Sequence, residues 1–196
     1  MAKWPMKSQA RVAGIDDGPY MRKSEKTPIV ITIMRLDGYI EGFLSAYIET
    51  DGSDSSEIIS HTLNSSRFGT QIRAILSDGA CLAGFNVLDL KQLNSACGVP
   101  VLTCSDEEPD TPSVRKALEH NFDDWEYRLE LIKNWTPERI ELDDGICHIR
   151  YEGITKKRAE WLVRTITKRG RTPEPIRISH LAAGAIFKNR GEIDGR

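Results

Sequence analysis

The 196-residue sequence predicts an α/β domain in which a mixed β-sheet is covered by helices. Short runs rich in Val and Ile are bounded by turn residues, and they alternate with longer stretches of helical periodicity. An Asp-Gly turn near the start favours antiparallel first strands, whereas the middle of the chain has a β-α-β-α-β rhythm. Because this length suits one hydrophobic core, we treat residues 1–196 as a single domain.

Two Val- and Ile-rich runs at the start of the chain are typical of strands, Arg11–Asp16 and Pro28–Arg35, with a loop between them. Asp37-Gly38 then forms a turn, after which residues 40–49 continue as the hairpin partner of the second strand. The sequence therefore predicts three antiparallel strands at the start.

The run Asp51-Gly52-Ser53-Asp54 ends the third strand, and Ser53 or Asp54 can cap a helix that follows. The expected central elements are a helix over about 55–66, a strand over 71–76, a helix over 89–97 and a strand over 99–104. In the last part of the chain we expect helices over 113–120 and 123–133, a hairpin of 139–142 with 146–151 around Asp143-Asp144-Gly145, and helices over 155–168 and 177–188.

The composition indicates a globular protein, with 39% hydrophobic and 29% charged residues. No apolar run approaches the roughly 18 residues that a membrane span needs, and the N-terminus lacks the apolar core of a signal peptide, so we expect a cytoplasmic location. The four cysteines have no CxxC spacing, which favours reduced, buried thiols over zinc ligands or disulfides.

The net charge of −2 conceals an asymmetry along the chain. Residues 150–190 hold 11 Lys and Arg against three Glu, so this segment is strongly basic and the remainder is acidic. Such polarity suits a protein that holds a metal with carboxylates and nucleic-acid phosphates with a separate basic face. A solvated basic helix is the alternative interpretation.

Acidic side chains stand at the ends of two expected strands. Asp16 and Asp17 stand at the end of the first strand, and Asp78 stands at the end of the strand over 71–76. If these strands are neighbours, Asp16 and Asp78 meet at one edge of the sheet, where a divalent cation would relieve their repulsion. Oxygen ligands favour magnesium or manganese. The alternative is that each Asp-Gly forms only a turn.

A third carboxylate is expected, and Asp51 is the first choice because it follows the third strand where the chain enters a helix. Asp54 and Glu49 are the alternatives. Asp54 can instead act as the N-cap of that helix, and Asp51 can belong only to an Asp-Gly turn.

Three segments resemble endonuclease V in the order that this family has them. The run from Arg171 to His180, Arg-Thr-Pro-Glu-Pro-Ile-Arg-Ile-Ser-His, is similar to its Pro-Glu-Pro-Leu-Arg-x-Ala-His segment. Gly14-Ile15-Asp16 resembles its first catalytic strand, and Ser77-Asp78-Gly79 resembles its Val-Asp-Gly strand end. Residues 14–19, 64–68 and 122–126 are more similar still to the archaeal endonuclease dU branch, so the resemblance covers almost the whole chain.

The resemblance implies an RNase H-like mixed sheet of about five core strands with helices on both faces and an added β-hairpin. It also implies a magnesium- or manganese-dependent endonuclease of DNA repair that cleaves nucleic acid, DNA foremost, at deaminated bases such as deoxyuridine. Asp16 and Asp78 match the family's metal ligands, and Asp17 is a further candidate. Asp51 stands in the third position, although Glu49-Thr50-Asp51-Gly52 departs from the family's Phe-Arg-Glu. The family's His-Gly after the central Asp-Gly is replaced by Ala80-Cys81, so hypoxanthine specificity is not implied.

His180 is the fourth catalytic candidate that the resemblance implies. Two prolines in Pro173-Glu174-Pro175 fix the entry into the last helix and so direct this histidine. It could orient a water, contact phosphate or lie near a metal. A packed or capping histidine is the alternative.

The basic segment supplies candidate phosphate contacts, namely Lys168, Arg169, Arg171 and Arg177. An unstacked base needs a stacking wall, for which the candidates are Tyr20, Phe85, Phe122 and Trp125, although aromatic residues are more often buried in the core. There are two rival hypotheses: a non-catalytic nucleic-acid-binding module, and a small-molecule enzyme or phosphotransfer receiver. The residues themselves distinguish neither DNA from RNA nor one oligomeric state from another.

Overall fold

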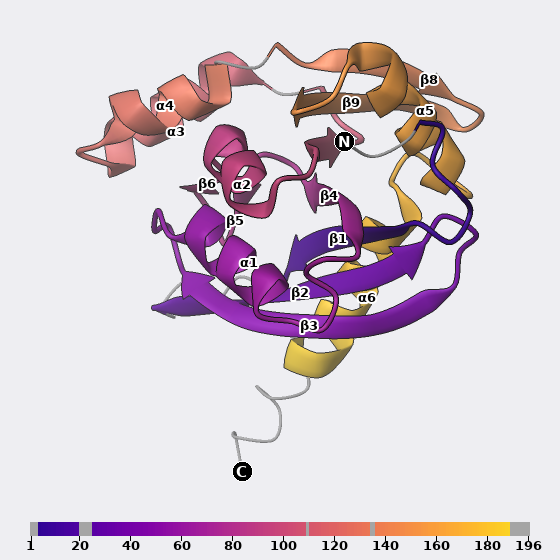
Figure 1. Ribbon diagram of the computed structural model, residues 1–196. Coiled ribbons are helices and arrows are strands. Elements are labelled where there is room, and N and C mark those ends of the chain that lie inside the picture. Colours follow the sequence, from indigo (N-terminus) through magenta and orange to yellow (C-terminus); the bar gives the residue numbers. More distant parts are fainter. Residues whose placement is uncertain (1–3, 20–24, 109, 134–135, 189–196) are drawn as a thin grey trace.

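A seven-stranded mixed sheet forms the centre of the computed structural model, which describes residues 4–19, 25–108, 110–133 and 136–188 (Figure 1). Its strands, in spatial order, are β3 (Ile40–Glu49), β2 (Lys26–Arg35), β1 (Arg11–Asp17), β4 (Ile72–Asp78), β7 (Val101–Ser105), β9 (Gly145–Glu152) and β8 (Glu138–Leu142). A separate two-stranded ribbon pairs β5 (Cys81–Leu82) with β6 (Asn86–Val87).

The pairing of the strands confirms the predicted mixed sheet. β1, β2 and β3 are antiparallel, as the Asp-Gly turn predicts, whereas β1, β4 and β7 are parallel neighbours. The hairpin of β8 and β9 pairs with β7 through β9. The hairpin therefore extends the main sheet, which is larger than the predicted core of about five strands. The short β5–β6 ribbon is not among the predicted elements.

Helices cover both faces of the sheet (Figure 1). One hydrophobic core lies under α1 (Ser55–Asn64) and α2 (Leu90–Cys97), and a second lies under α5 (Lys156–Ile166) and α6 (Glu174–Lys188). The remaining pair, α3 (Thr111–Asn121) and α4 (Trp125–Lys133), extends away from the sheet over a smaller third cluster. Among the described residues, no helix combines the length and apolar character that crossing a membrane requires.

Several boundaries differ from the predictions by a few residues. α6 begins at Glu174, three residues before the predicted start, because Pro175 is tolerated in the first turn of a helix, where its missing amide is not needed. α5 ends at Ile166, two residues before the predicted end. All four cysteines are free thiols; Cys104 and Cys147 are buried, as predicted, whereas Cys81 and Cys97 are only half-buried.

Candidate metal and nucleic-acid site at the ends of β1 and β4

The parallel register of β1 and β4 places the predicted carboxylates side by side. Ile15 pairs with Ser77, so Asp16 and Asp78 each stand one residue further on, at the carboxyl ends of neighbouring strands. Asp16 is only 3% exposed, whereas the Asp78 side chain reaches solvent. The structure thus brings the first two predicted metal ligands to the same sheet edge, as expected for parallel neighbours.

The carboxylates at this edge oppose one another's ionisation. Burial raises the pKa of Asp16 to about 7, and the negative charges of Asp78 and Asp17 contribute to the rise. Burial also raises the pKa of Asp17. Partial burial raises the pKa of Asp78 although its side chain reaches solvent, and the charges of Asp106 and Asp17 raise this pKa further. Crowded carboxylate oxygens of this kind fit a hard divalent cation such as Mg²⁺ or Mn²⁺.

α6 lies directly against β1 because residue 14 is a glycine. A Cβ atom at Gly14 would lie 2.3 Å from the backbone carbon of Pro175. The buried Ser179 then fastens the helix to the sheet, since its Oγ donates to the Gly14 carbonyl at 2.8 Å and accepts from the Thr32 amide at 3.0 Å. These contacts fix the rotation of α6 over the carboxylates.

His180, the next residue along α6, contacts the buried carboxylate. Its Nδ1 lies 2.8 Å from Asp16 Oδ2, and this hydrogen bond lowers the pKa of Asp16 against the stronger effect of burial. The His180 side chain is nevertheless 72% exposed, so the rest of the ring faces solvent. Arg177 is three residues earlier and therefore on the same face of the helix. This geometry lets His180 orient Asp16 and still reach a bound molecule.

Asp17 contacts the β5–β6 turn while its carboxylate stays within hydrogen-bonding reach of the Asp16 side chain, a contact that acts against the burial that raises the pKa of Asp17. Its Oδ2 accepts a hydrogen bond from the Ala83 amide in the β5–β6 turn. The structure therefore joins this predicted metal ligand to a loop on the α1 and α2 side of the sheet. Its charge still contributes to the raised pKa of Asp16 and Asp78.

Asp51 supports the same loop. It has a positive φ of 57°, its Oδ1 accepts from the Phe85 amide at 2.8 Å, and its own amide donates to the Ala83 carbonyl at 2.8 Å. Arg128 donates to the carbonyl oxygens of Asp51, Gly52 and Phe85 at 2.9, 2.8 and 2.7 Å. The carboxylate thus has a structural partner within the loop that follows β4.

The third ligand that we expected is not assembled by the protein alone. Within the described ranges, no three His, Cys, Asp or Glu side chains come together as a metal-binding group, so Asp51 does not join Asp16 and Asp78. Among the alternatives, Asp54 accepts from the Glu49 amide at 3.0 Å and from Asn86 Nδ2 at 2.7 Å. Asp54 occupies the N-cap position of α1 without a side-chain hydrogen bond to the helix.

Asp106 is a charged residue near the site that our sequence reasoning missed. It follows β7, the next parallel strand, and its carboxylate is the largest charge effect that raises the pKa of Asp78. Arg171 Nη2 lies 3.1 Å from Asp106 Oδ2, and Nη1 donates to the Asp106 carbonyl at 2.9 Å. A third acidic strand end was the available signal, but the expected strand stopped at Cys104 and no glycine follows Asp106.

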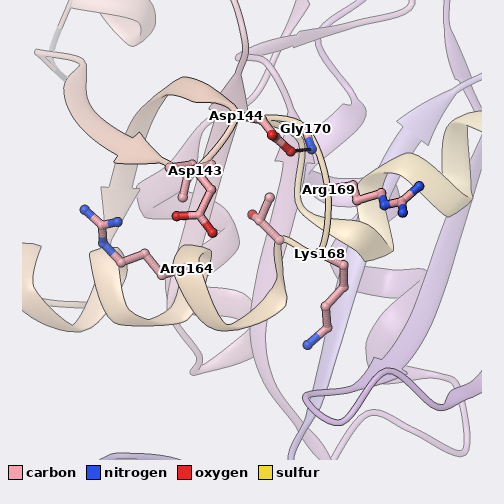
Figure 2. Close-up of a pocket in the computed structure, with 8 residues that line it drawn as sticks. Asp143, Asp144, Arg164, Lys168, Arg169 and Gly170 are labelled. Carbon is pink, nitrogen blue, oxygen red and sulfur yellow. Dashed lines mark hydrogen bonds between the residues drawn. The ribbon is translucent and has the colours of Figure 1, made fainter.

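The predicted phosphate contacts lie in and around the segment that joins α5 to α6. Lys168 and Arg169 line a hollow of about 360 Å³ beside the β8–β9 turn (Figure 2). Figure 2 also shows Asp143 and Asp144 at this hollow, and Asp144 Oδ2 accepts from the Gly170 amide at 2.7 Å. Both cationic side chains are exposed. Arg171 reaches toward β7 and Arg177 lies on α6, so the four cations are not one compact cluster.

The aromatic candidates are dispersed. Tyr20 lies outside the described residues. Phe85 and Phe122 pack edge to face with ring centroids 5.6 Å apart, and both are half-buried. Trp125 begins α4, with the Arg115 guanidinium 5.7 Å from its ring centroid. The structure thus gives Phe85 and Phe122 a packing role and places Trp125 on the α3–α4 pair.

Comparisons with known proteins cover nearly the whole chain. A family model described as endonuclease dU matches residues 8–187. The UPF0215 protein of Methanosarcina acetivorans is 38% identical over 195 residues, which is 97% of this chain and 96% of that protein.

Two solved structures share the fold. A protein of unknown function from Archaeoglobus fulgidus is 31% identical and has a TM-score of 0.80, covering 90% of this chain and 97% of that one. Endonuclease V from Ciona intestinalis, in complex with a 24mer DNA that contains an inosine followed by a ribo-adenosine, is 11% identical with a TM-score of 0.62, over 94% of this chain and 87% of that one. The architecture is therefore RNase H-like, as the sequence resemblance implied.

Proposed function

The chain belongs to the endonuclease dU family, whose activity is that of a nuclease, and from this premise we propose a metal-dependent endonuclease that acts on DNA at or near deaminated bases such as deoxyuridine. The nuclease activity is inferred from membership of this family. The observation that supports metal dependence is the pairing of Asp16 with Asp78 at the ends of two parallel strands, with His180 bound to Asp16. A role in DNA repair and a cytoplasmic location stay predictions from the sequence.

In this proposal Asp16 and Asp78 hold Mg²⁺ or Mn²⁺, and the bound cation supplies Lewis-acid activation of water and of the scissile phosphate. Asp16 must be ionised to serve as a ligand, and the hydrogen bond from His180 favours that ionised form. The exposed part of the His180 ring is placed to orient a water or a phosphate oxygen. Because the described residues assemble no group of three metal-binding side chains and the β5–β6 turn holds Asp51, water and substrate oxygens would complete the coordination.

The basic side chains of residues 168–177 would hold the phosphate backbone. Phosphate contacts of this kind position a strand without reading its bases, and they make affinity fall as salt rises. The DNA in the endonuclease V complex from Ciona intestinalis favours DNA as the substrate class here, since the two folds correspond over most of both chains.

A cleavage panel tests this proposal. Labelled single- and double-stranded DNA and RNA, carrying uracil, hypoxanthine or neither, are incubated with the protein in Mg²⁺, in Mn²⁺ and in EDTA. We expect cutting of uracil-containing DNA that requires the metal, and a loss of roughly 1,000-fold or more in Asp16→Asn and Asp78→Asn.

Asp123→Asn is the matched control, because it removes an exposed carboxylate at the α3–α4 junction. Binding without cutting in every condition would favour the rival hypothesis of a non-catalytic nucleic-acid-binding module. Cutting that persists in EDTA would refute the metal requirement alone.

A further inference from the structure

The side chain of Arg171 is held in place by contacts that are distant in the chain. Its Nη1 donates to the Asp106 carbonyl at 2.9 Å, and its Nη2 lies 3.1 Å from Asp106 Oδ2. Its stem lies against Gly145, where a Cβ atom would come within 2.8 Å of Arg171 Cδ. Arg177, another predicted phosphate contact, instead pairs with Glu174, three residues away on the same helix. Of these two cations, Arg171 is therefore the one that the tertiary structure orients.

The linker that carries Arg171 is bound to the β8–β9 turn next to it. Asp144 Oδ2 accepts from the Gly170 amide at 2.7 Å, as Figure 2 shows. Gly170 has a φ of 69°, a conformation that a side chain would disfavour. Because Gly145 in the same turn contacts Arg171, the turn holds two successive residues of the linker. A guanidinium held in this way loses little conformational freedom when it binds a ligand.

Asp106 connects Arg171 to the proposed metal ligands. In the parallel register of β4 and β7, Asp78 pairs with Cys104, so Asp106 stands two residues further on at the same edge of the sheet. Among the charges that raise the pKa of Asp78, that of Asp106 has the largest effect, which places the two carboxylates near each other. The Arg171 guanidinium therefore lies beside the site, next to the carboxylate that borders Asp78.

We propose that Asp106 is a positioning residue that directs the Arg171 guanidinium to the phosphate next to the scissile one. This inference rests on the proposed nuclease function. A strand bound here meets the carboxylates of Asp16, Asp78 and Asp106, and a cation held by the first two leaves the third charge uncompensated. Arg171 compensates it, and the bonds to Asp106 use two of the five N–H groups of the guanidinium, so it can also donate to a phosphate oxygen. Fixing that phosphate would align the scissile one with the cation.

The first test separates the cleavage rate from the affinity for DNA. Asp106→Ala removes the acceptor that orients Arg171 and leaves the charge of Arg171, so we expect the single-turnover cleavage rate to fall about 30-fold. The affinity for DNA in EDTA should stay equal or rise, because the variant loses a negative charge. Asp106→Asn loses the same charge but keeps an oxygen that can accept from Arg171, and its rate should stay within about fivefold of wild type.

Arg171→Lys tests the other partner. Lysine keeps the positive charge but lacks the planar fork that bonds both Asp106 oxygens, so we expect a loss of about 30-fold in rate with nearly unchanged affinity. The double variant Asp106→Ala/Arg171→Lys should be about as slow as either single variant, because both changes break one arrangement. Glu160→Ala is the matched control: it breaks a similarly exposed pair with Arg164, whose atoms are 3.0 Å apart, and should change the rate less than about threefold.

Thermal unfolding of each variant checks that it folds. The positioning role is overturned if Asp106→Asn cleaves as slowly as Asp106→Ala, or if the two losses multiply in the double variant. An NMR measurement tests the same role without cleavage: the Arg171 Nε–Hε signal should shift when a single-stranded oligonucleotide is added in EDTA, and it should shift less in Asp106→Ala.

The NMR result separates this inference from the nuclease proposal. An Arg171 signal that does not shift, or that shifts equally in wild type and Asp106→Ala, overturns the inference whether or not the chain cuts DNA. A chain that shows the expected shifts but cuts nothing refutes the nuclease proposal alone.

Discussion

Neutralising Asp16 should stabilise the metal-free protein at neutral pH. The folded-state pKa of about 7 lies above the ordinary value of 3.8, so the folded protein holds this proton to higher pH than the unfolded chain does. Ionisation therefore opposes folding, and stability that is fully present below about pH 4 is lost as the pH rises through 7. A difference of about three in pKa corresponds to about 4 kcal/mol as an upper limit.

Asparagine removes the charge and can keep the local hydrogen bonds. The Asp17 amide donates to Asp16 Oδ1 at 2.8 Å, and an asparagine oxygen can accept this bond while its amide faces His180. In EDTA we expect Asp16→Asn to exceed wild type in unfolding free energy by up to about 4 kcal/mol at pH 8 and by less than about 1 kcal/mol at pH 4. Urea titrations followed by tryptophan fluorescence measure the difference.

Magnesium separates the charge effect from an unrelated gain in stability. Saturating Mg²⁺ should stabilise wild type but not Asp16→Asn, because only the ionised carboxylate is a ligand. Asp123→Asn should differ little from wild type at either pH. A stability gap that is the same at pH 4 and pH 8, or that widens toward low pH, would falsify the assignment of an ionisation-opposed carboxylate at this site.

Three further perturbations have defined outcomes. His180→Ala removes the bond that lowers the pKa of Asp16, so the acid limb of the pH–rate profile should move to higher pH and the maximal rate should fall about 100-fold; an unmoved limb contradicts this. Gly14→Ala places a Cβ 2.3 Å from the backbone of Pro175, and urea unfolding should show a loss of about 3 kcal/mol; a loss below about 1 kcal/mol would mean that α6 shifts freely. Arg171→Gln should weaken DNA binding and reduce the slope of log affinity against log salt by about one, as measured by fluorescence anisotropy; an unchanged slope excludes a phosphate contact.

The parts of the site that could be predicted from sequence follow from strand geometry. Asp16 and Asp78 each stand at the end of a strand of buried residues. Neighbouring parallel strands place their carboxyl ends at the same edge of the sheet, so these two local sequence patterns were enough to predict that the two carboxylates lie together. The mixed sheet could likewise be predicted, from the alternation of expected strands and helices and from the turn residues between them. The hairpin of β8 and β9 was visible as a local pattern, but its pairing with β7 depends on which sheet edge is open, and that is not a local property.

The position of Asp51 in the structure depends on contacts that are distant in the chain. Asp51 resembles a ligand because it follows a strand, yet its backbone carbonyl is held by Arg128, which comes 77 residues later. No pattern near Asp51 signals this contact. Asp106 was missed for the opposite reason, since its strand end lacks the glycine that marks Asp16-Asp17-Gly18 and Asp78-Gly79.

The contacts around Asp16 offset part of the cost of ionising it at this edge. Burial and two nearby carboxylates oppose its ionisation, whereas Ser179 fastens α6 where His180 can stabilise the charge. Since the described residues form no group of three metal-binding side chains, a magnesium ion would keep several positions for water and phosphate oxygen. Metal affinity and substrate affinity are then reciprocally coupled, because each ligand completes the site of the other. Because the protein supplies few ligands, the cation would bind tightly only when nucleic acid is present to supply the others.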